Sequence, residues 1–388
     1  MAFSVKASKL REAIRTIIPL VSGKTAYVIA QNVLIKQKQN HVELYATNLE
    51  VHAKTVLEVL ESADHSKEPI SVAVSPKIIN DLLKNLDDDD ILTFANVKSN
   101  DTGTDLVLSI VSNHGKYSIV AVSDKHFPAI DFSMSGVDFD IRIKDLLDII
   151  DKTSFATSKD NLRPHLAGVY FHFRPEMTTF VSSDGFMMIK LDNKGLVGGG
   201  TPSVIVPANA LNAIQSALKK LPDEEIVKIT ASKDHFLVYH PLFTMKCQTL
   251  NYSYPDYESI IPAPSDKIVI VEKNKLINAI KRLKYFADKS NEVIYIRFGP
   301  SLIDLKTRDV LSHYSGSEYL TCEYSGEEME MSFKVDMLLD VLSVLDTPYV
   351  KLNLYQPQRP ILIEPHPVPE DSSINIVELV MPFQEAGV

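Results

Sequence analysis

The stretch that decides the fold of this chain runs from Asn161 to Lys190 and reads NLRPHLAGVYFHFRPEMTTFVSSDGFMMIK. Two apolar runs rich in aromatic residues, at 166–173 and 179–181, flank a turn that contains Pro175. This pattern predicts two strands of a meander. The Ser-Asp-Gly at 183–185 predicts a tight turn in which glycine takes positive φ. We expect the apolar quartet that follows, 186–189, to be exposed, although an ordinary turn that feeds core residues has the same pattern.

Internal repetition organises the rest of the chain. A shift of 136 residues places Leu10 on Leu146, and it needs no gap over about forty residues. A shift of 266 residues places Leu10 on Leu276, within an almost literal copy of the surrounding residues. The chain therefore consists of three repeats of one unit.

Each repeat has two helical patterns. The first patterns begin near Ser8, which is expected to cap its helix, near Lys144 and near Lys275. The second pattern in each repeat follows an alternating strand and runs through 82–83, through 218 and over 338–345. Several short strands with polar turns follow every helix. The sequence thus predicts the α+β class, with two helices on one side of mostly antiparallel sheets in each domain.

The joints between the repeats also recur. Residues 127–130 read Phe-Pro-Ala-Ile, residues 254–257 read Tyr-Pro-Asp-Tyr, and a polar link follows each. We place the boundaries near 128–136 and 252–266. The predicted domains are 1–128, 129–254 and 255–388.

Composition excludes several classes of protein. No run of about 18 apolar residues exists, and this argues against a membrane span. The N-terminus lacks the pattern of a secretory signal, and Cys247 and Cys322 lie far apart without metal-ligand spacing. We therefore expect a cytoplasmic protein with buried thiols and no membrane partner. A net charge of −10 still allows a basic inner surface that contacts DNA.

None of the residue patterns that could form a phosphate-binding, metal-binding or catalytic site lies in the sequence context that such a site needs. The glycines at 198–200 precede a strand, whereas a phosphate-binding loop precedes a helix. The aspartates at 87–90 lack the alternating spacing of a calcium loop and read as a solvated loop. No two histidines are spaced for a helical zinc site. We predict no catalytic residues, no metal and no cofactor, so the protein is not expected to be an enzyme.

Five segments in one order carry a resemblance: RPHLAG at 163–168, SDG at 183–185, YPDY at 254–257, IIP at 260–262 and LVMPF at 379–383. This set resembles the bacterial DNA polymerase III beta subunit family, the sliding clamps, along the whole chain. The resemblance implies three clamp domains and a head-to-tail dimeric ring with helices lining the central hole. It implies a processivity factor that encircles duplex DNA and tethers the replicative polymerase and other clamp-binding proteins during replication and repair. The implied partners are DNA of any sequence, a second copy of the chain, the DNA polymerase III alpha subunit, the clamp loader and other clamp-motif proteins.

In that family the same segments form a pocket that binds partner peptides. Carried over position by position, its residues are Leu166, Ser183, Gly185, Phe186, Met187, Met188, Pro255, Ile260, Leu379, Val380, Met381, Pro382 and Phe383. Methionine and aromatic side chains repack easily, so such a groove can accept several partners. Each residue on its own could equally be core packing.

Cations on the predicted helices and beside them are candidates for phosphate contacts. The residues that we expect to face DNA are Lys9, Arg11, Arg15, Lys24, Lys152, Lys159, Lys281, Arg282 and Lys284. Phosphate contacts hold a duplex without reading its sequence. The alternative is a solvated helix face.

The resemblance also implies the seam of the dimer. It pairs the strand edge around Tyr117 and Ile119 of one chain with Tyr285 and Phe286 of the other. A protein-binding scaffold that does not encircle DNA remains the alternative function, and it would share the repeats but not the basic helices.

Overall fold

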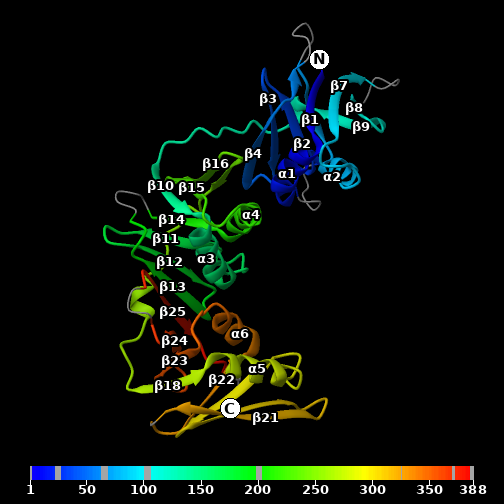
Figure 1. The fold of residues 1–388 in the computed structure, drawn as a ribbon. Coiled ribbons are helices and arrows are strands. Elements are labelled where there is room, and N and C mark those ends of the chain that lie inside the picture. Colours follow the sequence, from blue (N-terminus) through cyan, green and yellow to red (C-terminus); the bar gives the residue numbers. More distant parts are fainter. Residues whose placement is uncertain are drawn as a thin grey trace. The chain divides into compact units, whose positions relative to one another are not determined.

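The computed structural model describes residues 2–21, 28–62, 69–99, 106–197, 203–324, 326–368 and 372–384. It divides into two compact units (Figure 1). Unit 1 comprises Met1–Leu147 and Asn209–Thr249, and unit 2 comprises Asp148–Ala208 and Leu250–Val388. Each unit is built on one large sheet, and the described strand pairings are all antiparallel.

The sheet of unit 1 has 13 strands in the order β10-β15-β16-β17-β4-β3-β2-β6-β9-β8-β7-β1-β5. In chain order they are β1 (Ala2–Lys6), β2 (Val33–Gln37), β3 (His41–Thr47), β4 (Val51–Glu58), β5 (Glu61–Ser62), β6 (Ser71–Val74), β7 (Ile91–Ser99), β8 (Leu106–Ser112), β9 (Gly115–Ser123), β10 (Val137–Arg142), β15 (Ile226–Ala231), β16 (His235–His240) and β17 (Phe243–Gln248).

The sheet of unit 2 has 12 strands in the order β14-β11-β12-β13-β25-β24-β23-β18-β21-β20-β19-β22. In chain order they are β11 (Gly168–Phe173), β12 (Thr178–Ser183), β13 (Met187–Asn193), β14 (Val204–Pro207), β18 (Lys267–Glu272), β19 (Val293–Gly299), β20 (Leu302–Asp309), β21 (Tyr314–Glu323), β22 (Met329–Lys334), β23 (Tyr349–Leu354), β24 (Ile361–His366) and β25 (Ile374–Val380).

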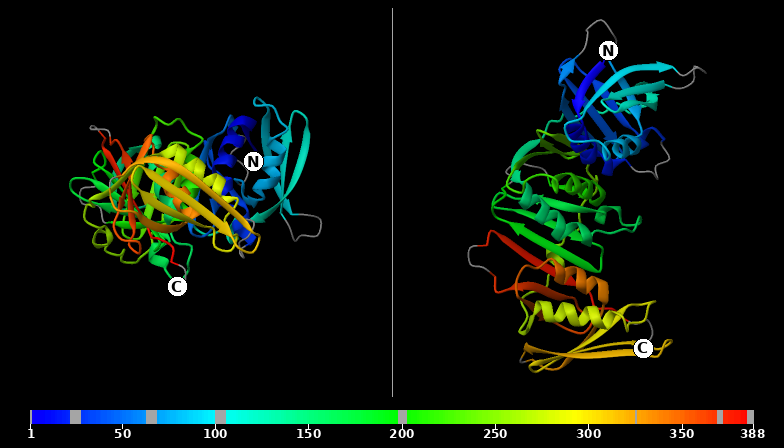
Figure 2. Two further views of the ribbon diagram at one scale, coloured as in Figure 1. Left: turned by 90° about the horizontal axis from the view of Figure 1, so that it is seen from below. Right: turned by 45° about the vertical axis from the view of Figure 1, so that its right-hand side comes forward.

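The α-helices come in pairs, as the repeats predict. They are α1 (Ala7–Ile17), α2 (Pro76–Leu83), α3 (Ile143–Thr153), α4 (Ala208–Leu218), α5 (Lys273–Lys284) and α6 (Val335–Ser343). The starts of α3 and α5 lie 136 and 266 residues after the start of α1, so the repeat spacing is confirmed. In unit 2, α5 and α6 pack side by side over one face of the strands from β19 to β22 (Figure 2). The α+β class is therefore confirmed.

In the first helix of each repeat, the first amide donates a hydrogen bond to a main-chain carbonyl of a distant loop. The N–H of Ala7 donates to the Asp90 carbonyl at 2.8 Å, and no side chain caps α1. The N–H of Ile143 donates to Glu225 at 2.8 Å, and the N–H of Lys273 donates to Pro348 at 2.9 Å. These carbonyls satisfy amide donors that a helix leaves unpaired at its first turn. The expected cap by Ser8 is therefore wrong, and the aspartate loop at 87–90 supports α1 instead of being merely solvated.

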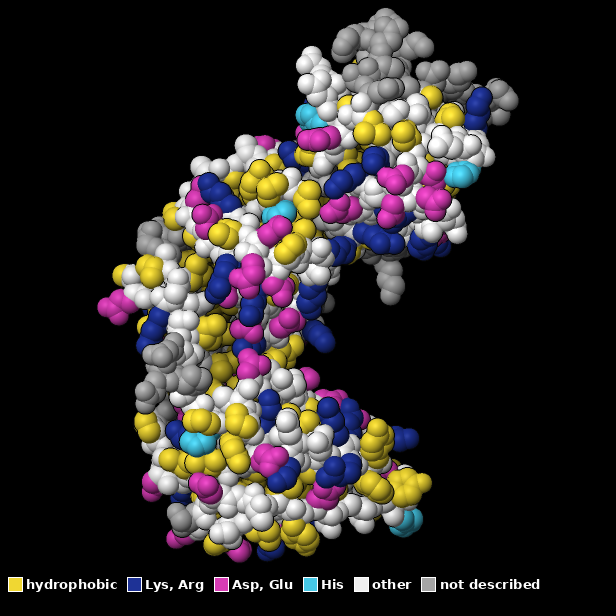
Figure 3. Space-filling view, viewed as in Figure 1, with side chains coloured by type: hydrophobic (Ala, Val, Ile, Leu, Met, Phe, Trp, Pro, Cys, Tyr) yellow, Lys and Arg dark blue, Asp and Glu magenta, His cyan; other side chains and the backbone are white. Residues whose placement is uncertain are grey.

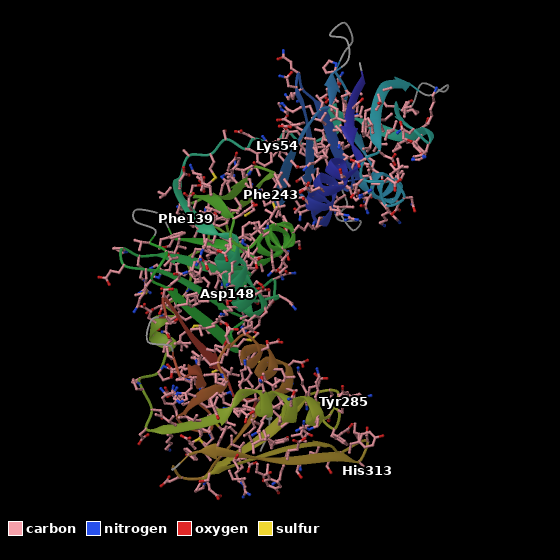
Figure 4. All side chains as sticks on the ribbon, in the orientation of Figure 1. Lys54, Phe139, Asp148, Phe243, Tyr285 and His313 are labelled. Atoms are coloured by element: carbon pink, nitrogen blue, oxygen red, sulfur yellow. The ribbon has the colours of Figure 1, made fainter. Side chains whose placement is uncertain are left out.

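The middle repeat is shared between the two sheets. Its strand β17 pairs with β4 of the first repeat, with Met245 opposite Ala53. Its strand β13 pairs with β25 of the third repeat, with Met188 opposite Leu379. Figure 4 labels Lys54 on β4 and Phe243 on β17, at the first of these joints. Main-chain hydrogen bonds thus connect each outer repeat to part of the middle one.

Aromatic pairs lie in the core of each unit. Phe3 and Phe94 stack in unit 1 with ring centroids 4.6 Å apart. Phe171 and Phe180 meet edge to face in unit 2 at 4.9 Å. No helix among the described residues is both long and apolar enough for a membrane span. The same residues contain no group of three or more His, Cys, Asp or Glu side chains that could hold a metal ion.

Candidate functional site

An apolar cluster on one face of the unit 2 sheet gathers residues from distant parts of the sequence. Met188 in β13 lies opposite Leu379 in β25, and Leu379 lies opposite Leu362 in β24. Side chains directly opposite each other in an antiparallel sheet share a face, so these three form one apolar row. The cluster comprises the buried residues Val181, Met188, Tyr257, Leu362 and Leu379 with the partly buried Tyr170, Tyr254, Ile261, Tyr355, Val377 and Met381.

The structure brings part of the predicted pocket into this cluster. Met188, Leu379 and Met381 are members of it. Successive side chains of a strand point to opposite faces, so Met187 and Val380, which lie opposite each other, face away from it. These two residues are buried on the other face of the sheet.

The remaining predicted pocket residues lie around the cluster on loops and strand ends. Leu166 ends the short helix η5 (Pro164–Leu166) and is buried, and Ile260 ends η6 (Glu258–Ile260) and is half exposed. Pro255 is exposed and Pro382 is buried. The expected exposure of 186–189 is wrong except for Phe186, which is 57% exposed. The other three begin β13, which has a partner strand on each side.

The Ser-Asp-Gly turn is fixed by its own side chains. The Asp184 carboxylate accepts from the N–H groups of Phe186 and Met187, both at 2.8 Å. The Ser183 hydroxyl accepts from the Gly185 N–H at 3.0 Å and donates to the Met187 carbonyl at 2.7 Å. Gly185 has φ of 92°, as predicted, and a Cβ there would lie 2.3 Å from an Arg163 nitrogen. The positive φ strains any residue with a side chain at this position, whereas the end of the flexible Arg163 side chain could move aside.

The C-terminal segment continues along the sheet beyond β25. The N–H of Met381 donates to the Phe186 carbonyl at 2.8 Å, and the N–H of Phe383 donates to the Ser332 carbonyl at 2.7 Å. The aromatic rings of Phe186 and Phe383 each have a cationic side chain next to them. The Arg163 guanidinium lies 5.9 Å from the Phe186 ring centroid, and the Lys334 Nζ lies 4.5 Å from that of Phe383. These contacts hold two aromatic rings in place.

Tyrosines that the sequence did not assign to the site form one wall of the cluster. Tyr170 stacks on Tyr254 with ring centroids 4.7 Å apart. The Tyr257 hydroxyl lies 2.8 Å from the His172 Nδ1. Burial raises the pKa of Tyr254, and its hydroxyl has no hydrogen-bond partner among the described residues. Alternation along β11 places Tyr170 and His172 on one face, so a pattern in the sequence could have identified Tyr170.

The corresponding position in unit 1 has polar side chains. A shift of 136 residues places His52 on Met188, and Lys246 lies opposite His52 as Leu379 lies opposite Met188. Lys246 is 8% exposed. A cation and an imidazole therefore occupy the places that a methionine and a leucine occupy in unit 2.

The buried lysine in unit 1 holds the link that follows the first repeat. Its Nζ donates to the main-chain carbonyls of Asp131 at 2.9 Å and Ser133 at 3.0 Å. His52 forms a hydrogen bond of 2.7 Å to the Thr47 hydroxyl. Burial, with smaller contributions from Lys246 and His235, lowers the pKa of His52.

Four of the cations predicted to face DNA are engaged within the chain. Arg11 donates to the carbonyls of Leu83 and Leu86 at the end of α2, with bonds between 2.7 and 3.1 Å. All four form ion pairs: Arg11 with Asp88, Lys152 with Asp148 and Asp346, Arg282 with Glu318, and Lys284 with Asp336. Figure 3 shows the same mixing of basic and acidic side chains on the visible surface. An internal partner reduces the charge that each of these four residues presents to phosphate.

The other predicted cations are more open. Arg15, Lys159 and Lys281 are exposed and have no ion-pair partner within the described part of the chain. Lys9 forms an ion pair with Glu12, one helical turn away, at 3.5 Å. Lys24 lies outside the described residues.

Two strands have a free edge over most of their length. β9 pairs with β8 along 115–121 but with β6 only at 121–123. β21 pairs with β20 along 314–321 but with β18 only at 322–323. Within the described residues, the second edge of each strand thus has no neighbour over 115–120 and 314–321.

The predicted seam residues differ in exposure. Tyr285 follows α5 and is 86% exposed (Figure 4), and Phe286 is 43% exposed, so neither is helix core. Gly316 of β21 lies beneath this segment, because a Cβ there would meet Leu283 at 2.8 Å. Tyr117 is half-buried, and Ile119 is only 4% exposed. The Ile119 side chain therefore belongs to the core of unit 1.

Comparison with family models covers nearly the whole chain. The N-terminal, central and C-terminal domain models of the DNA polymerase III beta subunit match residues 1–131, 140–256 and 258–383. The beta sliding clamp of Pseudomonas aeruginosa is 24% identical over 379 residues, which cover 97% of this chain and 99% of that protein. The beta sliding clamp of Synechococcus elongatus is 25% identical over 317 residues, which cover 81% of each.

Solved structures have the same fold. The crystal structure of the DNA polymerase sliding clamp from Pseudomonas aeruginosa superposes with a TM-score of 0.89 at 21% identity, and covers 99% of this chain and 100% of that one. The DNA polymerase III beta subunit from Thermotoga maritima gives a TM-score of 0.87 at 19% identity, with the same coverage. The chain belongs to the DNA polymerase III beta subunit family, the beta sliding clamps.

Proposed function

We propose that this protein is a DNA sliding clamp, a processivity factor that encircles duplex DNA and tethers the replicative polymerase and other clamp-binding proteins during replication and repair. The observation that carries this proposal is the match of three consecutive beta subunit domain models, in chain order, to residues 1–131, 140–256 and 258–383. A ring that surrounds DNA dissociates only if it opens or if the DNA ends. A tethered polymerase then meets the primer end at a high effective concentration.

Two chains close the ring in this proposal. Each contributes three domains, 1–128, 129–254 and 255–388. The free edge of β9 in one chain pairs with the free edge of β21 in the other, and Tyr285 and Phe286 pack against the partner there. Pairing would cover two open strand edges, which are otherwise sites of unwanted association. The support for this seam is the long free edge on both strands and the exposure of Tyr285.

Cations on the first helices and just beyond them hold the duplex. Arg15, Lys159 and Lys281 are exposed without an ion-pair partner among the described residues, and Lys9 has only a weak one. They would contact phosphates, which carry no information on base sequence. Few such contacts give weak, salt-sensitive attraction, which allows a ring to slide.

Partner peptides bind at the apolar cluster of unit 2 and at the loops around it. The anchor positions are Met188, Leu379 and Met381 from the cluster, with Phe186 and Phe383 beside them. The polymerase III alpha subunit and a clamp loader are the partners of this type. The protein holds the polymerase on DNA by enclosing the duplex and carries out no chemical step. Opening and loading the ring therefore depend on a separate ATP-driven loader.

Retention on DNA of different topology tests this function. The protein, loaded onto nicked circular DNA by a clamp loader, should remain bound at high salt and should leave when the circle is cut. A scaffold that does not encircle DNA would show no dependence on topology. A simple cationic binder would leave both forms as salt rises, and either result would refute the proposal.

A further inference from the structure

A groove of about 690 Å³ lies in unit 2 beside the predicted pocket. One wall is the link at 259–267, and the other is the turn at 355–360 between β23 and β24. The Ser265 hydroxyl donates to the Leu354 carbonyl and so ties the two walls together. Pro262, Pro264 and Pro360 line the groove, and proline fixes φ. The groove is therefore largely formed before anything binds, which lowers the entropic cost of binding.

The groove is continuous with the site of the proposed function. Ile260 lines the groove and is also a predicted pocket residue. Tyr355 lines the groove and packs against the apolar cluster that contains Met188 and Leu379. A peptide with its apolar side chains on this cluster would thus enter the groove if it continued past Ile260.

The charge in the groove favours an anion. Arg359 and Lys267 line it, and neither side chain has an ion pair or hydrogen bond among the described residues. Nearby cations, by contrast, are neutralised: Arg174 pairs with Glu258, and Lys351 pairs with Glu364. Asp266 is the one acidic residue in the lining, which leaves an excess of one positive charge.

We propose that this groove binds an acidic continuation of the partner peptide, next to the apolar residues that occupy the pocket. This inference rests on the proposed function. Arg359 is the main contact because it is exposed and its side chain has no partner in the described part of the chain. An exposed ion pair contributes modestly and is screened by salt, so the groove would select among partners that share the same apolar anchors.

A set of matched peptides tests the inference on the full-length protein. A short fluorescent peptide with leucine and phenylalanine anchors receives two aspartates, two serines or two lysines, at either end in turn. The Asp-Asp peptide should bind about twofold to fivefold more tightly than the Ser-Ser peptide at low salt, at one end only. This advantage should shrink at high salt, vanish in Arg359→Ala and turn into a preference for lysine in Arg359→Glu. Lys233→Ala, which removes an exposed cation in unit 1, should leave it unchanged.

The outcomes separate the two proposals. If the Asp-Asp and Ser-Ser peptides bind equally, or if the Lys-Lys peptide binds more tightly because Asp266 governs the groove, the inference is overturned while the pocket stands. If none of the peptides binds, the pocket itself is misplaced, and both proposals fail. Circular dichroism of each variant confirms that the fold is unchanged.

Discussion

Glu378 gives a sharp prediction on the stability of the strand that joins the second and third repeats. It lies in β25 opposite Ile189 and Ile363, is 0% exposed, and neither carboxyl oxygen has a partner among the described residues. A buried polar group without a partner costs about 1–3 kcal/mol. Glu378→Met keeps the length of the side chain and removes the polar atoms. The free energy of unfolding at pH 7 should therefore rise by about 1–3 kcal/mol.

The pH dependence of stability gives an independent test of the same residue. Burial raises the pKa of Glu378 well above its ordinary value of 4.5, and the opposing effect of Lys152 is smaller. A raised pKa in the folded state means that the folded protein binds the proton more tightly than the unfolded chain. The stabilisation is complete below pH 4.5 and is lost as pH rises through the folded-state pKa. Within that window stability should fall by about 1.4 kcal/mol per pH unit.

Urea unfolding followed by far-UV circular dichroism, at fixed chain concentration and several pH values, measures both effects. In Glu378→Gln the fall of stability with rising pH should disappear, but an unpaired polar group remains buried. In Glu378→Met both the pH dependence and the buried polar group are removed. Glu50→Gln removes an exposed carboxylate as a control and should change neither. If wild-type protein and Glu378→Gln show the same pH slope, Glu378 is not the buried acid described here.

Three further predictions concern the pocket, the seam and the joint in unit 1. Alanine at both Met381 and Phe383 should lower the affinity for a clamp-motif peptide at least about tenfold in anisotropy titrations, because each truncation removes apolar contact area. The mass of the two-chain particle should not change. Unchanged affinity would mean that the peptide binds elsewhere. Tyr285→Ser should shift sedimentation towards single chains without lowering the urea midpoint, and a persistent dimer would contradict the seam. The lowered pKa of His52 means that its neutral form stabilises the fold, so stability should fall as pH drops below 6.5. Burial also lowers the pKa values of His172 and His235, so His52→Gln should weaken this dependence without abolishing it. Lys246→Met should also reduce it, and equal slopes in all three proteins would exclude His52 as the cause.

The helices could be predicted from the sequence because an amphipathic helix is a local pattern. The spacing of Leu10 and Ile14 recurs in α3 and α5, and the three helices begin at the expected offsets. The expected cap at Ser8 was wrong because the carbonyls of Asp88 and Asp90 accept from the first amides of α1. That contact joins residues about 80 positions apart, and no local pattern encodes it.

The candidate site was predictable only in part for the same reason. The Ser-Asp-Gly turn is local, and its positive φ at Gly185 follows from residue type. Leu362 joins the apolar cluster through its pairing with Leu379, and Tyr355 joins it from the turn after β23; the alternation along one strand specifies neither contact. The sequence shows which residues are cationic, but not that Arg11 and Lys152 have partners within the fold. Only the structure distinguishes cations with an internal partner from those that are available for phosphate.

The division of the middle repeat between two sheets limits how this protein can be dissected. A fragment cut at both repeat boundaries would lose β4 and β25, and the hydrogen-bonding groups of β17 and β13 would be left bare. Bare edges of that length recruit any strand they meet, so the excised piece should aggregate instead of folding alone. Threefold repetition in a gene thus need not yield three modules that can be expressed, swapped or deleted one at a time.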